Sequence, residues 1–318
     1  MTTLLVCSAG GHLQQMWALH SRFGLVDDPV WVTFDTPQAR SLLAGQDVVY
    51  TPYVAPRDIP NSVRVARIAT ALIRERDIDR VISTGASVAV SVMVPARARG
   101  ITCHYIESAA RSDGPSLSGR MVSRLPGVNL YTQYPAWTGG RWHYAGSVFD
   151  GYRAGPAIAG APYTPGSVVV TLGTIAPHGF RRAVERLLLT LPNDADVFWQ
   201  TGVTDVSGLG IDANINVPSH ELAARIAEAD LVVAHSGTGS ALTAMDAGKC
   251  AVLLPRLAAH GEHIDDHQLQ IAGELDRRGL AIRCAVDDLE PSVFAAAMSS
   301  SVIAGVAAPS FGLLRDEL

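Results

Sequence analysis

The segment LVVAHSGTGS, residues 231–240, decides the predicted fold of this 318-residue chain. Its first half is a continuous apolar run, which is typical of a strand that is buried on both faces of a parallel sheet. Small residues end the run, and the helical pattern ALTAM follows at 241–245. We therefore predict a strand, a tight loop and a helix in that order.

The same pattern occurs three more times along the chain. An apolar run ends in a glycine-containing turn and leads into a helical segment at residues 4–11, 81–85 and 168–174. Further strands are predicted at 30–34, 48–50, 101–106, 197–200 and 251–254. Strands that alternate with helices predict the α/β class, with doubly wound parallel sheets. Because ligands bind beyond the carboxyl ends of strands in such sheets, we expect the functional residues in the glycine-rich turns.

The four glycine-rich turns fall two to each half of the chain. Between them, residues 151–166 are rich in Gly, Pro and Ala, a composition typical of a linker. We predict two Rossmann-like domains that face a central cleft. The predicted parts are a first domain at 1–150, a linker at 151–162, a second domain at 163–290, and a C-terminal helix and tail at 291–318.

Composition excludes several classes of protein. Hydrophobic residues make up 48% of the chain and charged residues 17%, which excludes disordered, collagen-like and coiled-coil proteins. The four cysteines form no CxxC pair, so we expect neither a disulfide framework nor a clustered zinc site, and a reducing cytoplasm fits. We also expect no signal peptide and no membrane span. The N-terminal half is mildly basic but lacks interleaved aromatic residues, so we expect no nucleic-acid partner.

Residues 236–240 form a candidate phosphate site. The N-terminus of a helix binds anions through its free backbone N–H groups and its dipole. Gly237 and Gly239 allow the backbone to approach a ligand closely. The pattern is neither a P-loop nor GxGxxG, and an ordinary capped turn between strand and helix is the alternative.

A polar segment follows the strand at 251–254. Three histidines, three acids and a glutamine lie within residues 260–268. His263 and His267 are four residues apart and would share one helix face, as metal ligands can. The glutamate of an HExxH motif is missing, however, and the acids are hard ligands. Recognition of a polar sugar, a metal site and a solvated helix start remain three interpretations of this segment.

His12 is the candidate catalytic residue of the N-terminal half. It follows Gly10 and Gly11 in the first turn of a predicted helix, where the dipole keeps an imidazole neutral and able to accept a proton. A helix-capping histidine is the alternative. Two DxD patterns, at 77–79 and 194–196, are interpreted as solvated loops, so we expect no bound metal.

The order and spacing of these motifs resemble a known family. Segments 235–240, 247–249, 255–257 and 261–269 resemble the donor-binding domain of family 28 GT-B glycosyltransferases, above all its Alg13-like members. Segments 8–13, 81–85, 105–108, 116–120 and 145–149 resemble the Alg14-like partner. The chain as a whole resembles an Alg14-like and Alg13-like fusion of bacterial exopolysaccharide or capsule synthesis and, more distantly, MurG-like enzymes.

This resemblance implies a cytoplasmic hexosyltransferase that works at the inner face of the cell membrane. The family implies a UDP-sugar donor, inversion at the transferred carbon, a polyprenyl-pyrophosphate-linked sugar as acceptor, and neither a cofactor nor an essential metal. Two rival functions remain open. One is a UDP-GlcNAc 2-epimerase-like enzyme, and the other is a non-catalytic module that binds a nucleotide sugar.

The resemblance also implies roles for individual residues. His12 would be the general base, with Glu107 as the second candidate. The UDP diphosphate would contact Gly173, Thr174, Ser236, Gly237, Thr238, Gly239 and Ser240. The uracil and ribose would contact Ser219, His220, Thr243 and Asp246. The donor sugar would contact Glu262, His263, Asp266, His267 and Gln268. The acceptor side would include Gly10, Gly11, Thr84, Gly85, Arg111 and Arg120.

Residues 116–125 are a candidate for peripheral membrane contact. At helical spacing, Leu117, Met121 and Leu125 lie close to one face, with Arg120 and Arg124 on a neighbouring face. Apolar side chains beside arginines are typical of a helix at a lipid surface. An amphipathic helix that packs on its own sheet is the alternative.

Overall fold

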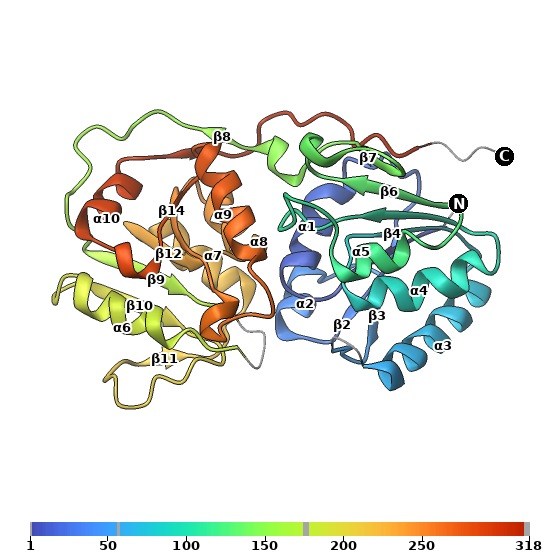
Figure 1. The fold of residues 1–318 in the computed structure, drawn as a ribbon, viewed down its shortest axis with the longest axis horizontal. Coiled ribbons are helices and arrows are strands. Elements are labelled where there is room, and N and C mark those ends of the chain that lie inside the picture. Colours follow the sequence, from blue (N-terminus) through green and yellow to red (C-terminus); the bar gives the residue numbers. More distant parts are fainter. Residues whose placement is uncertain (1, 56–57, 174–177, 315–318) are drawn as a thin grey trace. The chain divides into compact units, whose positions relative to one another are not determined.

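The computed structural model describes residues 2–55, 58–173 and 178–314, and the chain divides into two compact units. The N-terminal unit comprises Met1–Phe149 together with Ala308–Leu318, and the C-terminal unit comprises Asp150–Ala307. Each unit is built on a parallel sheet with helices on both faces (Figure 1). The predicted α/β class is therefore confirmed.

The N-terminal sheet has seven parallel strands in the order β3-β2-β1-β4-β5-β6-β7. The strands are β1 (Thr2–Val6), β2 (Val30–Phe34), β3 (Val48–Thr51), β4 (Ile78–Ser83), β5 (Thr102–Ile106), β6 (Val128–Thr132) and β7 (Trp142–Tyr144). The order changes direction at β1, because β2 and β3 lie on one side of it and β4 to β6 on the other. The carboxyl ends of β1 and β4 therefore flank the topological switch point, where such sheets bind ligands.

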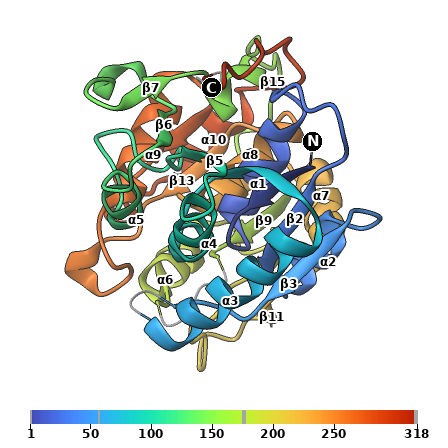
Figure 2. The ribbon, with the colours of Figure 1, turned by 90° about the vertical axis from the view of Figure 1, so that its right-hand side faces the viewer.

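Five α-helices connect these strands: α1 (Gly11–His20), α2 (Pro37–Leu42), α3 (Ile59–Glu75), α4 (Ser87–Arg97) and α5 (Leu117–Val122). Because parallel crossovers are right-handed, the change of direction at β1 places α1 and α2 on one face and the later helices on the other. Helices α3, α4 and α5 accordingly pack in a row (Figures 1 and 2). The side chains between this row and the sheet form the core of the unit, with Tyr105 and Met93 at its centre.

The C-terminal sheet has six parallel strands in the order β11-β10-β9-β12-β13-β14. They are β9 (Ser167–Thr171), β10 (Asp196–Gln200), β11 (Ala213–Asn214), β12 (Leu231–His235), β13 (Ala251–Leu254) and β14 (Ala281–Arg283). The helices are α6 (Arg181–Thr190), α7 (Ser219–Glu228), α8 (Thr238–Asp246), α9 (His267–Arg277) and α10 (Pro291–Met298). A separate antiparallel pair joins β8 (Arg153–Ala154) to β15 (Val302–Ile303). Short 3-10 turns lie at η1 (Pro135–Trp137), η2 (Val148–Gly151), η3 (Ala258–His260) and η4 (Val286–Asp288).

The two helices that matter most for the site begin differently. Helix α5 is capped by its own sequence, because the Ser116 hydroxyl accepts a hydrogen bond from the Gly119 N–H. Helix α8 begins after Gly237, which has no side chain to cap it. The first N–H groups of α8 therefore lack the intramolecular partner that a Ser or Asp cap supplies.

The end of the chain returns to the N-terminal unit. The Phe311 N–H donates to the Arg22 carbonyl, and the Phe311 ring makes edge contacts with Phe23 and Tyr131. The Arg22 guanidinium in turn donates to the carbonyl of Pro309. Buried aromatic contacts of this kind bind the tail to the unit formed by the start of the chain.

All strands predicted from apolar runs are confirmed, but the edge strands β7, β11 and β14 and the inner strand β6 were not predicted. Strands β7, β11 and β14 are two or three residues long, and β6 carries polar residues within its run. Their positions come from pairing with a neighbour rather than from a periodic pattern of their own.

The predicted amphipathic helix at 116–125 is shorter than expected. Helix α5 ends at Val122, which is buried, and Leu125 packs against the core from the following turn. Leu117 and Met121 are 61% and 45% exposed. No helix among the described residues has both the length and the hydropathy to cross a membrane.

Candidate functional site

In the C-terminal unit the carboxyl ends of β9, β12 and β13 lie side by side. Ala234 is paired with Thr171 across β12 and β9, and His235 is paired with Leu254 across β12 and β13. The loops that leave these three strands therefore emerge together at one edge of the sheet. This is the edge at which doubly wound sheets bind ligands.

His235 occupies the centre of this edge and is enclosed by glycines. A Cβ atom at Gly173 would lie 2.6 Å from His235 Nε2, and one at Gly237 would lie 2.2 Å from the same atom. The ring nitrogen Nδ1 is 3.3 Å from the Thr171 carbonyl oxygen. Burial, helped by the positive charge of Arg256, lowers the pKa of His235 to about 3. The imidazole is therefore neutral at physiological pH, and both glycines are needed to make room for it.

The N-terminus of α8 is the candidate phosphate site. The first hydrogen bond of the helix runs from the Ala241 N–H to the Gly237 carbonyl. The backbone N–H groups of residues 238–240 lie before this bond and do not donate within the helix. The Ser236 hydroxyl beside them is buried and has no hydrogen-bond partner among the described residues. A buried polar group without a partner lowers the stability of the folded protein. The Ser236 hydroxyl therefore indicates a ligand that forms a hydrogen bond with it. Of the remaining predicted diphosphate contacts, Gly173 lies at this edge, and Thr174 falls outside the described residues.

Arg256 brings a buried cation to the same edge. Its guanidinium donates a short hydrogen bond to the Leu172 carbonyl and lies over the Phe180 ring, 5.6 Å from its centroid. Burial lowers the pKa of Arg256 to about 10, so the side chain stays charged at neutral pH. Its Nε atom is buried without a partner among the described residues. Arg256 and His235 lie in segments that resemble the family, but no role was predicted for either of them.

Two of the residues that we predicted to contact the donor sugar hold the loop together instead. Gln268 is buried, and its carboxamide oxygen accepts the Arg256 N–H at 2.9 Å. The Glu262 carboxylate, also buried, pairs with Arg182 at 3.0 Å and accepts the Leu257 N–H at 3.0 Å. These contacts fix the backbone of the polar loop.

The remaining polar residues of the loop meet in a tight turn. Helix α9 begins at His267, so His263 is not on it and the expectation of a shared helix face is wrong. The turn nevertheless brings the two rings together, with centroids 4.5 Å apart. His267 Nδ1 is 2.5 Å from Asp265 Oδ1, and the Asp266 carboxylate accepts the Ala258 N–H. Burial lowers the pKa of His263 to about 4.

The predicted uracil and ribose contacts are spread over two helices. Ser219 and His220 are the first residues of α7. Thr243 lies one turn into α8 and donates its hydroxyl to the Gly239 carbonyl at 3.0 Å. Asp246 lies at the far end of α8, where it accepts the Tyr152 hydroxyl at 2.5 Å. Asp246 is therefore separated from the 236–240 loop by the length of the helix.

In the N-terminal unit, His12 is fixed at the carboxyl ends of β1 and β4. Its Nδ1 is 2.6 Å from the Thr84 carbonyl oxygen, and the Thr84 hydroxyl donates to the His12 carbonyl at 2.9 Å. A proton on Nδ1 leaves the lone pair of the neutral ring on Nε2. A Cβ at Gly85 would lie 3.3 Å from the His12 ring, and Gly85 has a φ of +107°. The predicted residues His12, Thr84 and Gly85 therefore lie together, with Gly10 and Gly11 at the start of α1.

Glu107 is buried and has a structural role in this unit, so it is poorly accessible as a base. Its buried carboxylate accepts the N–H groups of Ser108 and Ser116 at 3.1 and 2.9 Å, and the Ser116 hydroxyl at 3.1 Å. Burial raises the pKa of Glu107. The carboxylate holds the start of α5 in place, which favours His12 over Glu107 as a base. Arg111 acts on Glu107 through its charge, and Arg120 is exposed with its Nε donating to the Pro115 carbonyl.

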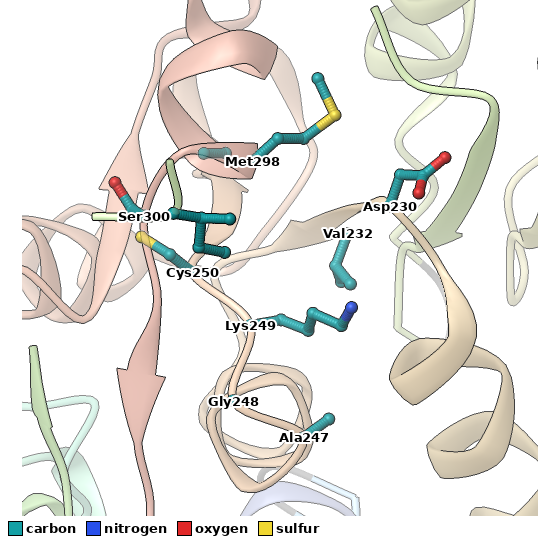
Figure 3. A pocket seen from close by; sticks show the side chains of 10 residues that line it. Asp230, Val232, Ala247, Gly248, Lys249, Cys250, Met298 and Ser300 are labelled. Carbon is teal, nitrogen blue, oxygen red and sulfur yellow. The ribbon is translucent and has the colours of Figure 1, made fainter. Parts of the chain in front are cut away.

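A cavity of about 120 Å³ lies away from this candidate site (Figure 3). It is lined by residues next to the amino-terminal ends of β12 and β13, including Asp230, Val232, Lys249 and Cys250. The Lys249 ammonium donates to the Ala229 carbonyl at 2.7 Å. The cavity is therefore at the opposite edge of the sheet from the glycine-rich loops.

Residues 168–304 match the model of the glycosyltransferase family 28 C-terminal domain. MurG of Acinetobacter baumannii is similar in structure, with a TM-score of 0.58, 19% identity, and 93% of this chain and 89% of that chain covered. The glycotransferase of kitacinnamycin aligns with a TM-score of 0.56, 17% identity and coverages of 93% and 89%. MnaA of Staphylococcus aureus, in a structure with UDP, aligns with a TM-score of 0.53, 13% identity and coverages of 93% and 94%. No curated protein sequence matches.

These similarities confirm the predicted fold, two Rossmann-like domains of the GT-B type. The site at the β9, β12 and β13 ends lies entirely within the stretch that matches the family 28 domain. The C-terminal unit is thus similar to the family 28 domain, and the solved structures, which are at most 19% identical, support the fold alone.

We predict that His235 makes the stability of the protein depend on pH. Its pKa of about 3 in the folded state is below the ordinary value of 6.5, so its stabilising contribution is complete above pH 6.5 and is lost as the pH falls. Between pH 7 and pH 5 the loss from this group is about 2 kcal/mol. Urea unfolding at both pH values should show a smaller pH dependence for His235→Asn than for the wild type.

His143→Asn is the matched control, because His143 is exposed on β7. Its unfolding free energy should follow the wild-type pH dependence. Equal pH dependence for His235→Asn and the wild type would contradict the neutral, buried state of His235.

Proposed function

We propose that the chain is a family 28 GT-B glycosyltransferase that moves a hexose-type sugar from a UDP-sugar to a polyprenyl-pyrophosphate-linked saccharide, with inversion. The observation that carries the proposal is the N-terminus of α8. It combines N–H groups without a side-chain cap and the buried, unpartnered Ser236 hydroxyl, inside the stretch that matches the family 28 domain. The structure of S. aureus MnaA with UDP supports a uridine nucleotide as the ligand of this fold.

The leaving group can be stabilised by the protein itself. UDP departs with negative charge, and a helix N-terminus with preorganised N–H groups favours that charge. The Arg256 cation at the same sheet edge adds an attraction that a low-dielectric environment strengthens. On this proposal the reaction needs no bound metal and no cofactor.

His12 is the proposed general base. The hydrogen bond from Nδ1–H to the Thr84 carbonyl would leave Nε2 to take the proton of the acceptor hydroxyl. Attack from the face opposite the leaving UDP would then invert the anomeric carbon. His263 and His267 of the polar loop would contact the donor sugar, and Ser219 and His220 the uridine.

The proposed acceptor is lipid-linked, so the protein would work at the cytoplasmic face of the membrane. Leu117 and Met121 are exposed on α5, with the exposed Arg120 and Arg124 beside them. Apolar side chains with arginines at headgroup level suit peripheral contact with an anionic surface. Arg111 would meet the acceptor pyrophosphate. The Alg14-like and Alg13-like fusion remains part of this proposal.

The function is tested by incubating the purified chain with a panel of UDP-sugars, with and without lipid extract, in EDTA. Release of UDP that requires the lipid acceptor is the expected result. Conversion of the sugar without acceptor would show an epimerase instead, and binding without turnover would show a non-catalytic module. Loss of activity in EDTA that magnesium or manganese restores would contradict a metal-independent transfer.

We predict that Gly239→Val weakens UDP binding at least tenfold. A valine side chain at the second residue of α8 would stand between the helix N–H groups and a diphosphate. Isothermal titration calorimetry with UDP measures the effect. Gly312→Val is the control, since a Cβ at Gly312 meets open space. Unchanged UDP affinity in a folded Gly239→Val protein would contradict the proposed position of the diphosphate at this loop.

We predict that His12→Ala lowers kcat about 100-fold while UDP affinity is retained. General base catalysis contributes about 10²–10⁴ in rate, and His12 lies in the unit that does not contain the proposed UDP site. Steady-state kinetics and calorimetry on the same protein separate the two effects. His143→Ala serves as the control. A loss of less than about tenfold would show that another group accepts the proton.

A further inference from the structure

The turn at residues 263–267 gathers side chains of the kind that bind transition metals. His263, Asp265 and His267 each bring one ligand atom within 4.8 Å of the ligand atoms of the other two. Two imidazole nitrogens and one carboxylate oxygen form a donor set typical of zinc sites that keep an open position. Magnesium and calcium prefer sets made of oxygen alone.

We infer that His263, Asp265 and His267 form a binding site for a divalent transition metal ion of the zinc class. The site goes beyond the proposed glycosyl transfer, which uses no metal. It differs from the zinc site of a metalloprotease helix, because His263 and Asp265 precede α9 and only His267 lies on it, as its first residue.

One ligand nitrogen has no other use in the protein. His263 Nδ1 is buried and has no hydrogen-bond partner among the described residues. Buried polar atoms in native proteins are nearly always satisfied, so an orphaned imidazole nitrogen indicates a missing partner. A metal ion between the rings of His263 and His267, whose centroids are 4.5 Å apart, supplies one.

A second contact already orients the other histidine. His267 Nδ1 and Asp265 Oδ1 lie 2.5 Å apart, so a nitrogen and an oxygen of the donor set already face each other. A bound ion would replace the proton that the ring and the carboxylate share, because both groups bind metals in their deprotonated forms. The same carboxylate brings a negative charge to the cluster, which opposes the charge of Arg256 nearby.

The ligands need a small inward movement to bind. With metal–nitrogen bonds of about 2.0–2.1 Å at tetrahedral angles, ligand atoms lie about 3.3 Å apart. The present spread of up to 4.8 Å closes to that value by rotation of the three half-buried side chains. The Gln268 and Glu262 contacts hold the backbone on either side of the turn while this happens.

A bound ion would also affect the proposed reaction, and this consequence rests on the proposed function. His263 and His267 are assigned there to the donor sugar, so an ion on both rings would compete with the sugar. Zinc would then inhibit transfer, whereas it would leave the binding of UDP alone largely unchanged.

The test measures metal binding without any nucleotide sugar. The full-length chain, treated with a chelator and dialysed, is titrated with Co²⁺ and followed by its visible absorption, and with Zn²⁺ by calorimetry. One ion per chain is expected, with a Co²⁺ spectrum of imidazole and carboxylate ligation. His263→Ala, Asp265→Asn and His267→Ala should each weaken binding at least tenfold, because each removes or weakens one of the three ligands.

His260→Ala is the matched control, because His260 is exposed in η3 only three residues before His263. It should bind Co²⁺ as the wild type does. Two results would overturn the inference: no stoichiometric binding to the wild type, or equal binding by the folded His263→Ala and His267→Ala proteins. The metal titration contains no sugar nucleotide, so a failure of glycosyl transfer in the donor panel would not affect its outcome. Likewise, a failure to bind metal would not contradict the proposed glycosyl transfer.

Discussion

The fit of the His235 ring between Gly173 and Gly237 is the constraint on which the C-terminal site depends. A β-carbon at either glycine would lie within 2.6 Å of the ring, so neither position can carry another residue without moving the imidazole. The ring separates the loop after β9 from the loop after β12, and its burial keeps it neutral. An imidazole without charge adds no repulsion to Arg256 beside it. The geometry of the proposed anion site therefore follows from one side chain that makes no proposed contact with the diphosphate.

The sequence was sufficient to predict the architecture because the two sheets consist of buried parallel strands. Runs such as Leu231–His235 and Ser167–Thr171 are apolar on both faces, and each is followed by small residues where the chain turns. Edge strands such as β11 and β14 carry no such pattern, because their neighbours determine where they pair. Spacing likewise could not predict the end of α5 at Val122, and Leu125 packs against the core from the turn that follows the helix.

The sequence predicted the site as a region better than it predicted the role of each side chain. The polar residues at 260–268 do gather in one loop after β13, but Gln268 and Glu262 turn inward and hold its backbone. Glu107 likewise braces α5 with both of its oxygens. A sequence shows which residues can donate or accept, whereas the partner that each one takes depends on contacts that are distant in the chain. His235 and Arg256 were missed for the converse reason, as both adjoin apolar strands and resemble core residues.

The burial of Arg256 explains how one cation can matter at an anion site. In water an arginine near a diphosphate is strongly screened, but in a low-dielectric environment the same charge acts more strongly. Burial carries a cost, which the Leu172 carbonyl and the Phe180 ring offset in part. The cost appears in the pKa of about 10, which is lowered but still well above neutrality. The protein thus holds a permanent positive charge beside the α8 N-terminus without an ion from solution. A helix dipole and a fixed guanidinium together can perform the task that a divalent cation performs in metal-dependent transferases.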